Sequence, residues 1–325
     1  MTHPDPMRPR VSVVVVNWNG AEFLEKCLGS VQCQTYENRD CLLIDNASTD
    51  GSAELVQNLF PWARVVRNRE NLGFAQAANM GIALTGGEFV LLLNPDVFLE
   101  SDYIEVLLRH AVKENPAGSF GGKLLRQKTG DGPDPEIDSA GLVLLNGKRR
   151  PWDRGEGETD RGQYDAAEYV MGINGAAVCY RRSMLEDVKM DGEYFDSDFF
   201  MYFEDVDLAW RSLLFGWKSL YVPQARGYHA RGGARGRRNL KIRVHAARNR
   251  YLVFLKNEPF AVFTRYFFPA LAVELARLAV YAVREPSSLL GFFKFVSVIP
   301  GFLRKRRRVQ ERTKISPEEF ASWYR

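Results

Sequence analysis

Residues 11–20, VSVVVVNWNG, join an apolar, β-branched run to a polar Asn-Trp-Asn sequence and a glycine. A continuous run of valines is typical of a strand whose two faces are both covered, as in a parallel sheet. The run stops at Asn17, Trp18 and Asn19, so these side chains lie where the predicted strand ends. Ligands of open parallel sheets bind beyond the carboxyl ends of the strands. This stretch therefore predicts both the type of sheet and the edge that carries its site.

Strand and helix patterns alternate through the first hundred residues. This alternation predicts an α/β fold, a doubly wound, Rossmann-like and mostly parallel sheet. The predicted strands are 11–16, 41–46, 63–68 and 88–96, and the predicted helices are 21–31, 51–60 and 73–84.

Polar residues follow every one of these strands. Asp45 and Asn46 follow the second, Asn68 and Asn71 the third, and Asn94 and Asp96 the fourth. Any one of them is as well explained by a turn or a helix cap, but four sets at one sheet edge favour a binding site. The sequence contains neither G-x-G-x-x-G after the first strand nor a P-loop. A nucleotide here would therefore be held by side chains and strand-end backbone.

The segment FFMYFEDVDLAWRSLLFGW (199–217) places Glu204, Asp205 and Asp207 in what reads as a buried helix. On a helix, Asp207 and Arg211 are four residues apart and form a ready ion pair. Asp205 points about 100° away from them and has no cation nearby in sequence. An unpaired carboxylate among aromatic residues is where a raised pKa and base chemistry are expected. The alternative is that all three acids favour a helix N-terminus.

The chain has 325 residues, of which 46% are hydrophobic and 26% charged, so it can bury a large core in one or two domains. Its four cysteines form no C-x-x-C pair, and its N-terminus lacks the apolar run of a signal peptide. We therefore expect a reduced, cytoplasmic setting.

The net charge of +4 conceals an asymmetry between the two ends. Residues 231–325 carry 21 Lys and Arg against 6 Asp and Glu, and residues 1–230 carry 23 against 34. An acidic front suits cations or sugars, and a basic tail suits phosphates, anionic membrane or nucleic acid.

Three separated segments resemble the inverting family 2 glycosyltransferases of the GT-A fold. They are VSVVVVNWNGAEFLEKCLGSVQCQTYENRDCLLIDNASTDGS, NRENLGFAQAANMGIALTGGEFVLLLNPD and FFMYFEDVDLAWR. Within that family the chain is similar to the bacterial rhamnosyltransferase-like branch that builds surface polysaccharides such as O-antigen. The resemblance covers about residues 10–257, including RNRYLVFLKNEP. It implies a flexible N-terminus (1–10), a GT-A catalytic domain (11–257) and a C-terminal region of amphipathic, basic helices (258–325).

The resemblance also implies roles for the strand-end residues. Asn17, Trp18, Asn19 and Asp45 would hold the base and ribose of a nucleotide-sugar donor. Amide and carboxylate groups can bond to both. Asn46, Asn71 and Asn79 are further donor-binding candidates that could equally hold loops together.

NPD (94–96) stands where the family has its Asp-x-Asp metal motif. Asp96 would bind Mg²⁺ or Mn²⁺, whereas Asn94 contacts the donor without contributing charge. His229 is a possible second metal ligand, although a lone histidine is as often structural. The glycines and arginines that follow it suit a loop closing over the diphosphate.

For the acceptor side, the resemblance makes Asp205 the catalytic base of the "ED" motif. Glu204, Trp152 and Arg211 are the expected acceptor-binding residues, with Trp152 as a sugar-stacking platform. Residues 123–170, rich in Gly, Pro and charge, are predicted to be insertion loops before a strand at 175–182.

The tail shows features of a membrane-interface segment. Residues 259–303 contain no uncharged run above nine, too short for the roughly 20 residues of a membrane span. Within 270–284, the polar residues Glu274, Arg277, Tyr281 and Arg284 cluster on one helical stripe, which predicts an interfacial helix. RKRRR (304–308) then adds a polybasic patch. Packing of these helices on the core is a weaker alternative, and a nucleic-acid partner is not expected.

These features predict an enzyme bound peripherally to the inner face of the plasma membrane. The resemblance suggests dTDP-L-rhamnose as donor and a polyprenyl-diphosphate-linked sugar as acceptor. The alternatives are a UDP-sugar transferase of the same fold and a non-catalytic protein that binds sugar nucleotides or polyanions, for which Asn94 and the basic tail argue. The intact Asp205 and Asp96 favour the enzyme. A nucleotidyltransferase would need a basic phosphate-gripping loop after the first strand, which NWNGAEFL lacks.

Overall fold

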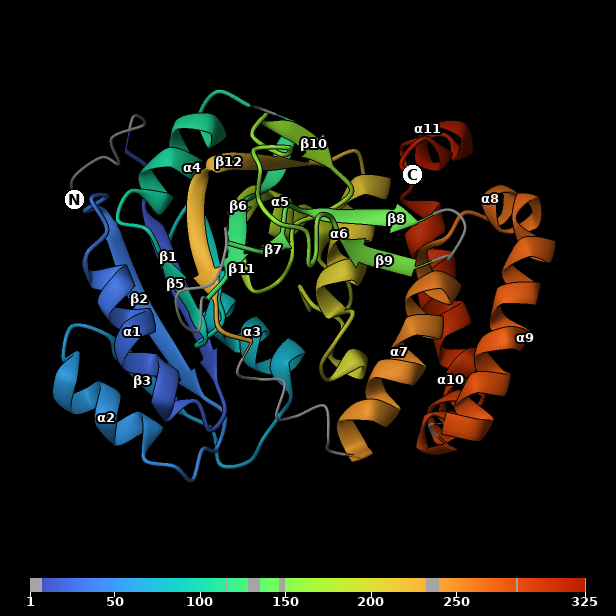
Figure 1. Ribbon diagram of the computed structural model, residues 1–325, viewed down its shortest axis with the longest axis horizontal. Helices are drawn as coiled ribbons and strands as arrows, with labels where there is room; N and C mark the ends of the chain where they lie inside the picture. The colour runs from blue at the N-terminus through green and yellow to red at the C-terminus, as the bar shows by residue number, and fades with distance from the viewer. Residues whose placement is uncertain are drawn as a thin grey trace.

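The computed structural model describes residues 8–114, 116–127, 135–145, 150–231, 240–284 and 286–324. Figure 1 shows a central sheet flanked by helices, with a layer of C-terminal helices at one end. In the described residues the sheet has the strand order β10-β12-β6-β11-β4-β1-β2-β3, with β5 beside β12 and β7 beside β6.

The first half of the sheet is the parallel one that the sequence predicts. Strand β1 pairs in parallel with β2 and β4, and β2 pairs in parallel with β3. These strands are β1 (Val11–Asn17), β2 (Arg39–Asp45), β3 (Arg64–Arg67) and β4 (Phe89–Leu93). The helices that flank the sheet are α1 (Ala21–Gln32), α2 (Ser52–Leu59), α3 (Phe74–Ala83), α4 (Tyr103–Ala111) and α5 (Arg182–Val188).

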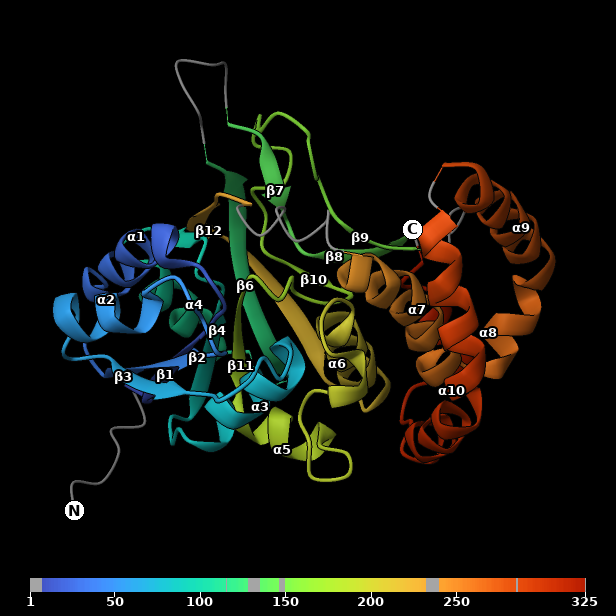
Figure 2. The same ribbon diagram turned by 90° about the horizontal axis from the view of Figure 1, so that it is seen from below.

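The apolar run of β1 is continuous because both faces of the sheet are covered. Val14 and Leu42 belong to the core on the α3 side, and Val13 and Leu43 belong to the core on the α1 and α4 side. Figure 2 shows α1 and α4 on one face and α3 on the other. This burial on both faces explains why alternation of polar and apolar residues is absent from the strand.

The second half of the sheet is mixed. Strand β11 runs antiparallel to both β4 and β6, whereas β12 is parallel to β6 and antiparallel to β5 and β10. The strand predicted at 175–182 is confirmed as β11. The bounds are β5 (Val97–Leu99), β6 (Ala117–Arg126), β7 (Ile137–Ser139), β10 (Glu168–Val170), β11 (Ala177–Arg181) and β12 (Lys218–His229).

The prediction of insertion loops over 123–170 is wrong for the described part of that segment. It contains the end of β6, then β7, a hairpin of β8 (Leu142–Leu145) and β9 (Arg150–Asp153), and β10. Gly and charged residues lower the strand propensity of this region, and pairing with the sheet overrides that preference. Trp152 lies in the hairpin opposite Val143.

The C-terminal helices pack on the rest of the molecule through one continuous core. Phe302, Val309 and Phe320 belong to the same buried cluster as Trp210 of α6, and the ring of Phe320 stacks on Trp210 at 5.4 Å. The boundary proposed at residue 257 therefore runs through a shared core. The helices are α6 (Glu204–Leu214), α7 (Leu240–Asn257), α8 (Phe260–Arg265), α9 (Phe267–Arg284), α10 (Pro286–Glu311) and α11 (Pro317–Ala321). None of the helices in the described ranges is long and apolar enough to cross a bilayer.

Candidate active site at the strand ends

The carboxyl ends of β1 and β2 bring the predicted donor-binding residues together. Asn17 Nδ2 donates to Asp45 Oδ1 at 3.2 Å, and both side chains are buried. Asn19 accepts from the Thr49 amide, and Trp18 is 44% exposed beside them. Asn17 Oδ1 is buried, and no donor in the described part of the chain bonds to it. Buried acceptors are normally satisfied, so this atom is suited to an N–H of a ligand.

The three further donor-binding candidates hold loops in the structure. The carboxamide of Asn46 donates to Asn71 Oδ1 at 2.9 Å and accepts from two groups within residues 68–72. Asn79 bonds to the backbone of residues 194–195 at 2.7–3.2 Å. Of the two roles left open for these side chains, the geometry favours loop support.

Asp96 and His229 meet at the same edge. Asp96 follows β4, His229 ends β12, and His229 Nε2 lies 3.3 Å from Asp96 Oδ1. On its other side, His229 Nδ1 lies 2.7 Å from Asp138 Oδ2, and Arg231 also contacts Asp138. Asn94 is half-buried, and its backbone bonds to Ala176 and Val97. The predicted loop after His229 falls mostly at 232–239, outside the described residues.

The charge state of His229 follows from its two carboxylate neighbours. Burial lowers its pKa, but the bonds to Asp138 and Asp96 outweigh this effect and raise the pKa to about 9. The ring is therefore an imidazolium that compensates two buried anions. A divalent cation next to Asp96 would supply that positive charge in place of the proton.

The residues present fit a divalent cation. A carboxylate and an imidazole are ligands that Mn²⁺ accepts, and Asp138 fixes the ring as metal-bound histidines require. No group of three or more His, Cys, Asp or Glu side chains suited to a metal occurs in the described residues. Two protein ligands suit a cation whose other positions are taken by phosphate oxygens and water.

Asp138 is a site residue that the sequence reasoning missed. It is fully buried in β7, where its carboxylate contacts His229, Arg231 and, at 3.9 Å, Arg126. Its sequence signal is weak, since it is one carboxylate between Ile137 and Ser139 in a segment read as a loop.

The segment predicted as one helix over 199–217 contains α6 only from Glu204 onward. Phe200, Tyr202 and Phe203 have positive φ angles and form a turn instead. The three acids consequently lie in the first half of α6, where the helix dipole favours negative charge. The structure thus combines the two predictions for this segment: the acids lie at a helix N-terminus, and Asp205 bonds to backbone amides and, among the described residues, to no cation.

Asp205 is half-buried at the start of α6. Its Oδ2 accepts from the Gly175 amide at 2.9 Å, and its Oδ1 accepts from the Val206 amide at 2.8 Å. Burial raises the pKa of Asp205 in spite of these bonds, which confirms the expected direction. A Cβ on Gly175 would lie 2.9 Å from the Asp205 Cβ, so this close approach requires glycine.

Asp207 and Arg211 form the predicted ion pair, at 2.9 Å, with both side chains buried. The remaining guanidinium nitrogens donate to the carbonyls of Val188 and Tyr194, each at 2.6 Å. The expected acceptor contact of Arg211 is thus replaced by internal bonds, because the side chain is 1% exposed. Arg211 holds α6 in place.

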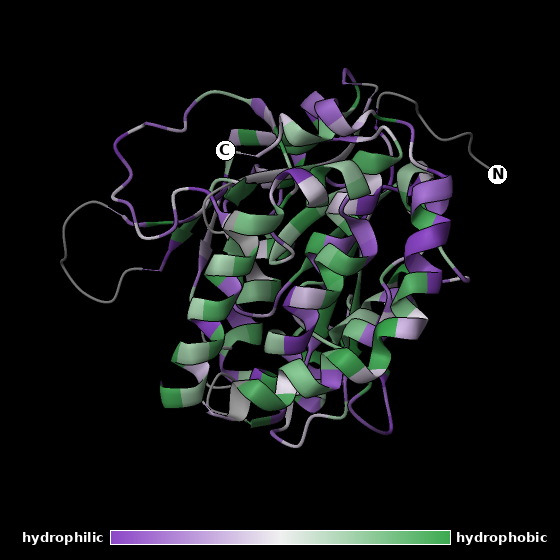
Figure 3. Cartoon of the chain, turned by 90° about the vertical axis from the view of Figure 1, so that its right-hand side faces the viewer, coloured by the Kyte–Doolittle hydropathy of each residue, from purple (hydrophilic) through white to green (hydrophobic). Residues whose placement is uncertain are grey.

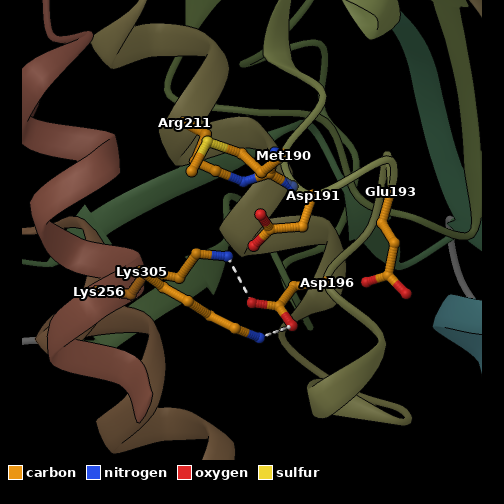
Figure 4. A pocket seen from close by; sticks show the side chains of 7 residues that line it. All are labelled: Met190, Asp191, Glu193, Asp196, Arg211, Lys256 and Lys305. Carbon is orange, nitrogen blue, oxygen red and sulfur yellow. Dashed lines mark hydrogen bonds and ion pairs between the residues drawn. The ribbon is translucent and has the colours of Figure 1, made fainter. Parts of the chain in front are cut away.

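A buried ion network continues from Asp207 to the C-terminal helices. Lys256 bonds to Asp207 at 2.9 Å and to Asp196 at 2.7 Å, and Lys305 bonds to Asp196 at 2.6 Å. Figure 4 shows both lysines reaching the Asp196 carboxylate. Burial opposes ionisation of Asp196, but the two lysines hold its pKa well below the usual range.

Glu204 directly precedes Asp205, and Trp152 directly precedes Asp153 in the β8–β9 hairpin. Glu204 is 7% exposed, and its Oε2 finds no hydrogen-bond partner among the described residues. Burial and the neighbouring Asp205 raise the pKa of Glu204 well above its ordinary value. Trp152 is half-buried and precedes Asp153, whose pKa burial raises to about 6, with Asp138 and Asp205 adding to the rise. The β8–β9 hairpin thus approaches the start of α6 at Asp153, whose carboxylate accepts from Asn174 Nδ2 at 2.6 Å.

The raised pKa of Glu204 predicts a stability effect. Because its pKa is higher in the folded than in the unfolded chain, the free energy of unfolding falls as pH rises from about 4 through the folded value. Glu204→Gln removes this cost and should raise the melting temperature by about 2–4 °C at pH 8, with no gain near pH 4. The exposed Glu25→Gln is the control in thermal unfolding. A gain that is equal at both pH values would contradict the assignment.

The sequence of the chain matches a known protein family and several characterised proteins. Residues 12–188 match the family model described as Glycosyl transferase family 2. The chain is 31% identical over 245 residues to the N-acetylglucosaminyl-diphospho-decaprenol L-rhamnosyltransferase of Mycobacterium tuberculosis, covering 69% of this chain and 77% of that protein. It is 32% identical over 129 residues to the glycosyltransferase GlyG of Streptococcus pneumoniae, covering 39% of this chain and 42% of the relative.

Solved structures share the fold at low sequence identity. The mannosyltransferase PcManGT of Pyrobaculum calidifontis, in complex with GDP-Man and Mn²⁺, superposes with a TM-score of 0.53 at 17% identity, covering 95% of this chain and 88% of that chain. TarS of S. aureus gives a TM-score of 0.56 at 15% identity, covering 93% of this chain and 55% of that chain.

Proposed function

This chain belongs to glycosyl transferase family 2, and from that premise we propose that it transfers L-rhamnose from dTDP-L-rhamnose to a polyprenyl-diphosphate-linked saccharide, with inversion, in surface-polysaccharide synthesis. The observation that carries the proposal is the meeting of three features at one sheet edge. They are the Asn17–Asp45 pair, the Asp96–His229 pair and the half-buried Asp205. The rhamnosyltransferase of M. tuberculosis supports the choice of sugar and acceptor, since its name specifies both.

The strand-end residues would bind the nucleotide-sugar donor. Asn17 and Asp45 offer the polar groups that a pyrimidine and a ribose require, and the exposed Trp18 ring offers a stacking surface. Asp96 and His229 would hold a divalent cation, which neutralises the charge that develops on the departing diphosphate.

Asp205 acts on the acceptor. Its raised pKa makes it a better proton acceptor than an ordinary aspartate. It removes the proton of the attacking hydroxyl while that oxygen bonds to the anomeric carbon and the diphosphate leaves from the opposite side. One displacement of this kind inverts the anomeric configuration.

A transfer assay tests the proposal. The purified chain is incubated with Mn²⁺, a polyprenyl-diphosphate-linked N-acetylglucosamine and a panel of dTDP-, UDP- and GDP-sugars. We expect transfer from dTDP-L-rhamnose above all others, with the product's anomeric configuration inverted by NMR. Preference for a UDP-sugar would overturn the donor assignment. Donor binding by thermal shift without any transfer or hydrolysis would favour the non-catalytic alternative.

The C-terminal helices support a place at a membrane surface through the face that α9 turns outward. Glu274 and Arg277 of its polar stripe face inward, where Glu274 bonds to Arg250 of α7 at 2.8 Å. The outward face is apolar, with Phe268 78%, Leu275 59% and Val283 83% exposed. Figure 3 looks onto this side, where the helices nearest the viewer are coloured largely as hydrophobic. Such a patch is rare on soluble monomers and marks a site of interaction.

The basic run 304–308 is only partly engaged within the molecule. Lys305 bonds to Asp196, Arg306 bonds to the Leu255 carbonyl at 2.8 Å, and Arg308 pairs with Asp191. These three side chains tie α10 to the rest of the molecule, whereas Arg304 and Arg307 are exposed and remain available to anionic headgroups. Arg265, Arg284 and Lys294 are further exposed cations, on α8, α9 and α10.

We therefore expect the chain to co-sediment with vesicles of phosphatidylcholine and phosphatidylglycerol. The double variant Leu275→Glu with Val283→Glu should lower the vesicle-bound fraction tenfold or more, because burial of each side chain contributes about 1.5–3 kcal/mol. These positions are chosen because removal of residues 259–325 would strip Phe302 and Phe320 from the core.

Leu59→Glu is the matched control for this experiment. Leu59 is 53% exposed on α2, at the other end of the molecule in Figure 1. Equal binding by the double variant and the control would remove α9 from the membrane-binding surface. Indifference of the intact chain to anionic vesicles would refute the membrane proposal altogether.

A further inference from the structure

The backbone adopts unusual dihedral angles at Phe200, Tyr202 and Phe203, immediately before α6. Met201 donates to the Phe199 carbonyl at 2.7 Å, and Phe200 has φ 64° and ψ −62°, which define a γ-turn of the rare, strained form. Tyr202 and Phe203 follow with φ of 67° and 71°. Three non-glycine residues at positive φ persist only where the surroundings hold them. We refer to residues 199–203 as the aromatic turn.

One side chain of α7 holds most of this turn. Asn249 is fully buried, and its Nδ2 donates to the carbonyls of Phe199 at 2.7 Å, Met201 at 2.9 Å and Tyr202 at 2.9 Å. Three carbonyl oxygens around one end of a carboxamide require that end to be the NH₂ group. Its Oδ1 accepts from the Arg248 guanidinium at 2.9–3.0 Å, which fixes the orientation.

The aromatic turn also contacts the start of α3 and the loop just before it. The Ala75 amide donates to the Phe200 carbonyl at 3.1 Å, and a Cβ on Gly73 would lie 2.5 Å from the Phe200 ring. Gly73 has φ 82°, so its conformation and this close approach both require glycine. The turn is therefore clamped between this loop and α7.

We propose that Asn249 is a positioning residue, which holds the aromatic turn and thereby sets the direction in which Asp205 points toward the acceptor. This inference rests on the proposed function, in which Asp205 is the base. Tyr202 is the last residue whose carbonyl Asn249 holds, and Asp205 comes three residues after it. Without the amide, three carbonyls lose their donor and the turn relaxes toward ordinary φ angles, which reorients the first turn of α6.

The body of α6 is held separately from its start. Asp207 bonds to Lys256 at 2.9 Å and to Asn257 at 2.9 Å, both at the other end of α7. Loss of the Asn249 amide therefore loosens the aromatic turn and leaves α6 attached to the C-terminal layer.

The test compares Asn249→Ala and Asn249→Asp with the intact chain in the rhamnosyl-transfer assay. We expect kcat to fall by about 10- to 100-fold, as for a base displaced by about 1 Å, with less than about a threefold change in the donor KM. The acid limb of the pH–kcat profile should move to lower pH, because a loosened Asp205 becomes better hydrated and its pKa falls.

Gln34→Ala is the matched control. Gln34 is also a buried amide that bonds three backbone groups, those of Ser30, Glu100 and Ile104 at 2.7–3.1 Å, and it lies between α1 and α4. It should lower the melting temperature without changing kcat or the pH profile. If Asn249 variants lose no more kcat than Gln34→Ala at an equal loss of stability, the proposal is wrong.

A second variant distinguishes a role of Asn249 in positioning Asp205 from a role in stability alone. It also provides a test if the single variants do not fold. Glycine adopts positive φ without strain, so Tyr202→Gly combined with Asn249→Ala should recover at least part of kcat. A folded double variant with no recovery overturns the proposal. Should Asp205→Asn itself retain normal turnover, the proposed function fails instead, and that result is separate from any obtained with Asn249.

Discussion

Replacing Asp205 with asparagine should lower turnover by about 10²- to 10⁴-fold, the range that a general base contributes. The amide is nearly isosteric, so the shape at the start of α6 is kept, but it cannot accept the proton of the acceptor hydroxyl. Donor affinity should stay normal because Asp205 lies apart from the Asn17–Asp45 pair in the hydrogen-bond network. The measurements are kcat in the transfer assay and donor Kd by thermal shift.

Asp191→Asn is the control for this substitution. Asp191 is a surface carboxylate with φ 53°, a conformation that asparagine also accepts, and it pairs with Arg308. It should leave kcat unchanged. Turnover near normal in Asp205→Asn would remove Asp205 from the mechanism and leave no base assigned in the described residues.

Substitution of Asp96 by alanine should abolish transfer, and excess EDTA should abolish it in the intact chain. The departing diphosphate would otherwise carry its developing charge without a counter-ion. His229→Ala should raise the Mn²⁺ concentration required for half-maximal activity. Asp138→Asn should raise it by about 10- to 100-fold, the usual effect of losing the group that orients a metal-bound histidine.

The exposed Asp102→Asn, at the start of α4, should leave the Mn²⁺ titration unchanged. Full activity in excess EDTA would exclude a cation from the mechanism. A Mn²⁺ titration that does not respond to His229→Ala would assign His229 to a structural role, as the cation that compensates Asp96 and Asp138.

The parts of the active site that are readable from the sequence are those made by local patterns. The run 11–16 marks a strand covered on both faces, and the parallel pairing of the strands places the polar residues that follow them at one edge of the sheet. The Asp207–Arg211 pair follows from helical spacing alone. The same spacing isolates Asp205 from any cation on its own helix, and the structure shows the raised pKa expected of it.

Other parts depend on residues far apart in the chain. His229 and Asp138 are 91 positions apart and meet because β12 and β7 both pair with β6. Residues 199–203 continue the apolar pattern of the following helix and are therefore predicted as helical. Asn249 and the packing of Phe200 impose a turn instead. On α9 the helical period of 3.6 residues identifies a polar and an apolar stripe, but it does not determine which stripe packs against α7 and which faces solvent.

The sequence by itself determined the parallel half of the sheet, and it predicted the edge of the candidate site and, through the family resemblance, the candidate base. Periodicity, strand polarity and helical spacing are properties of neighbouring residues, so they are visible in the chain. Only the tertiary structure decided that Asp138 supports His229, that Arg211 is internal and that α9 turns its apolar face outward. In each case a buried polar or charged group is satisfied by a group on another segment of the chain, since an unsatisfied buried charge is costly. Which partner it finds depends on the order of strands and helices in space.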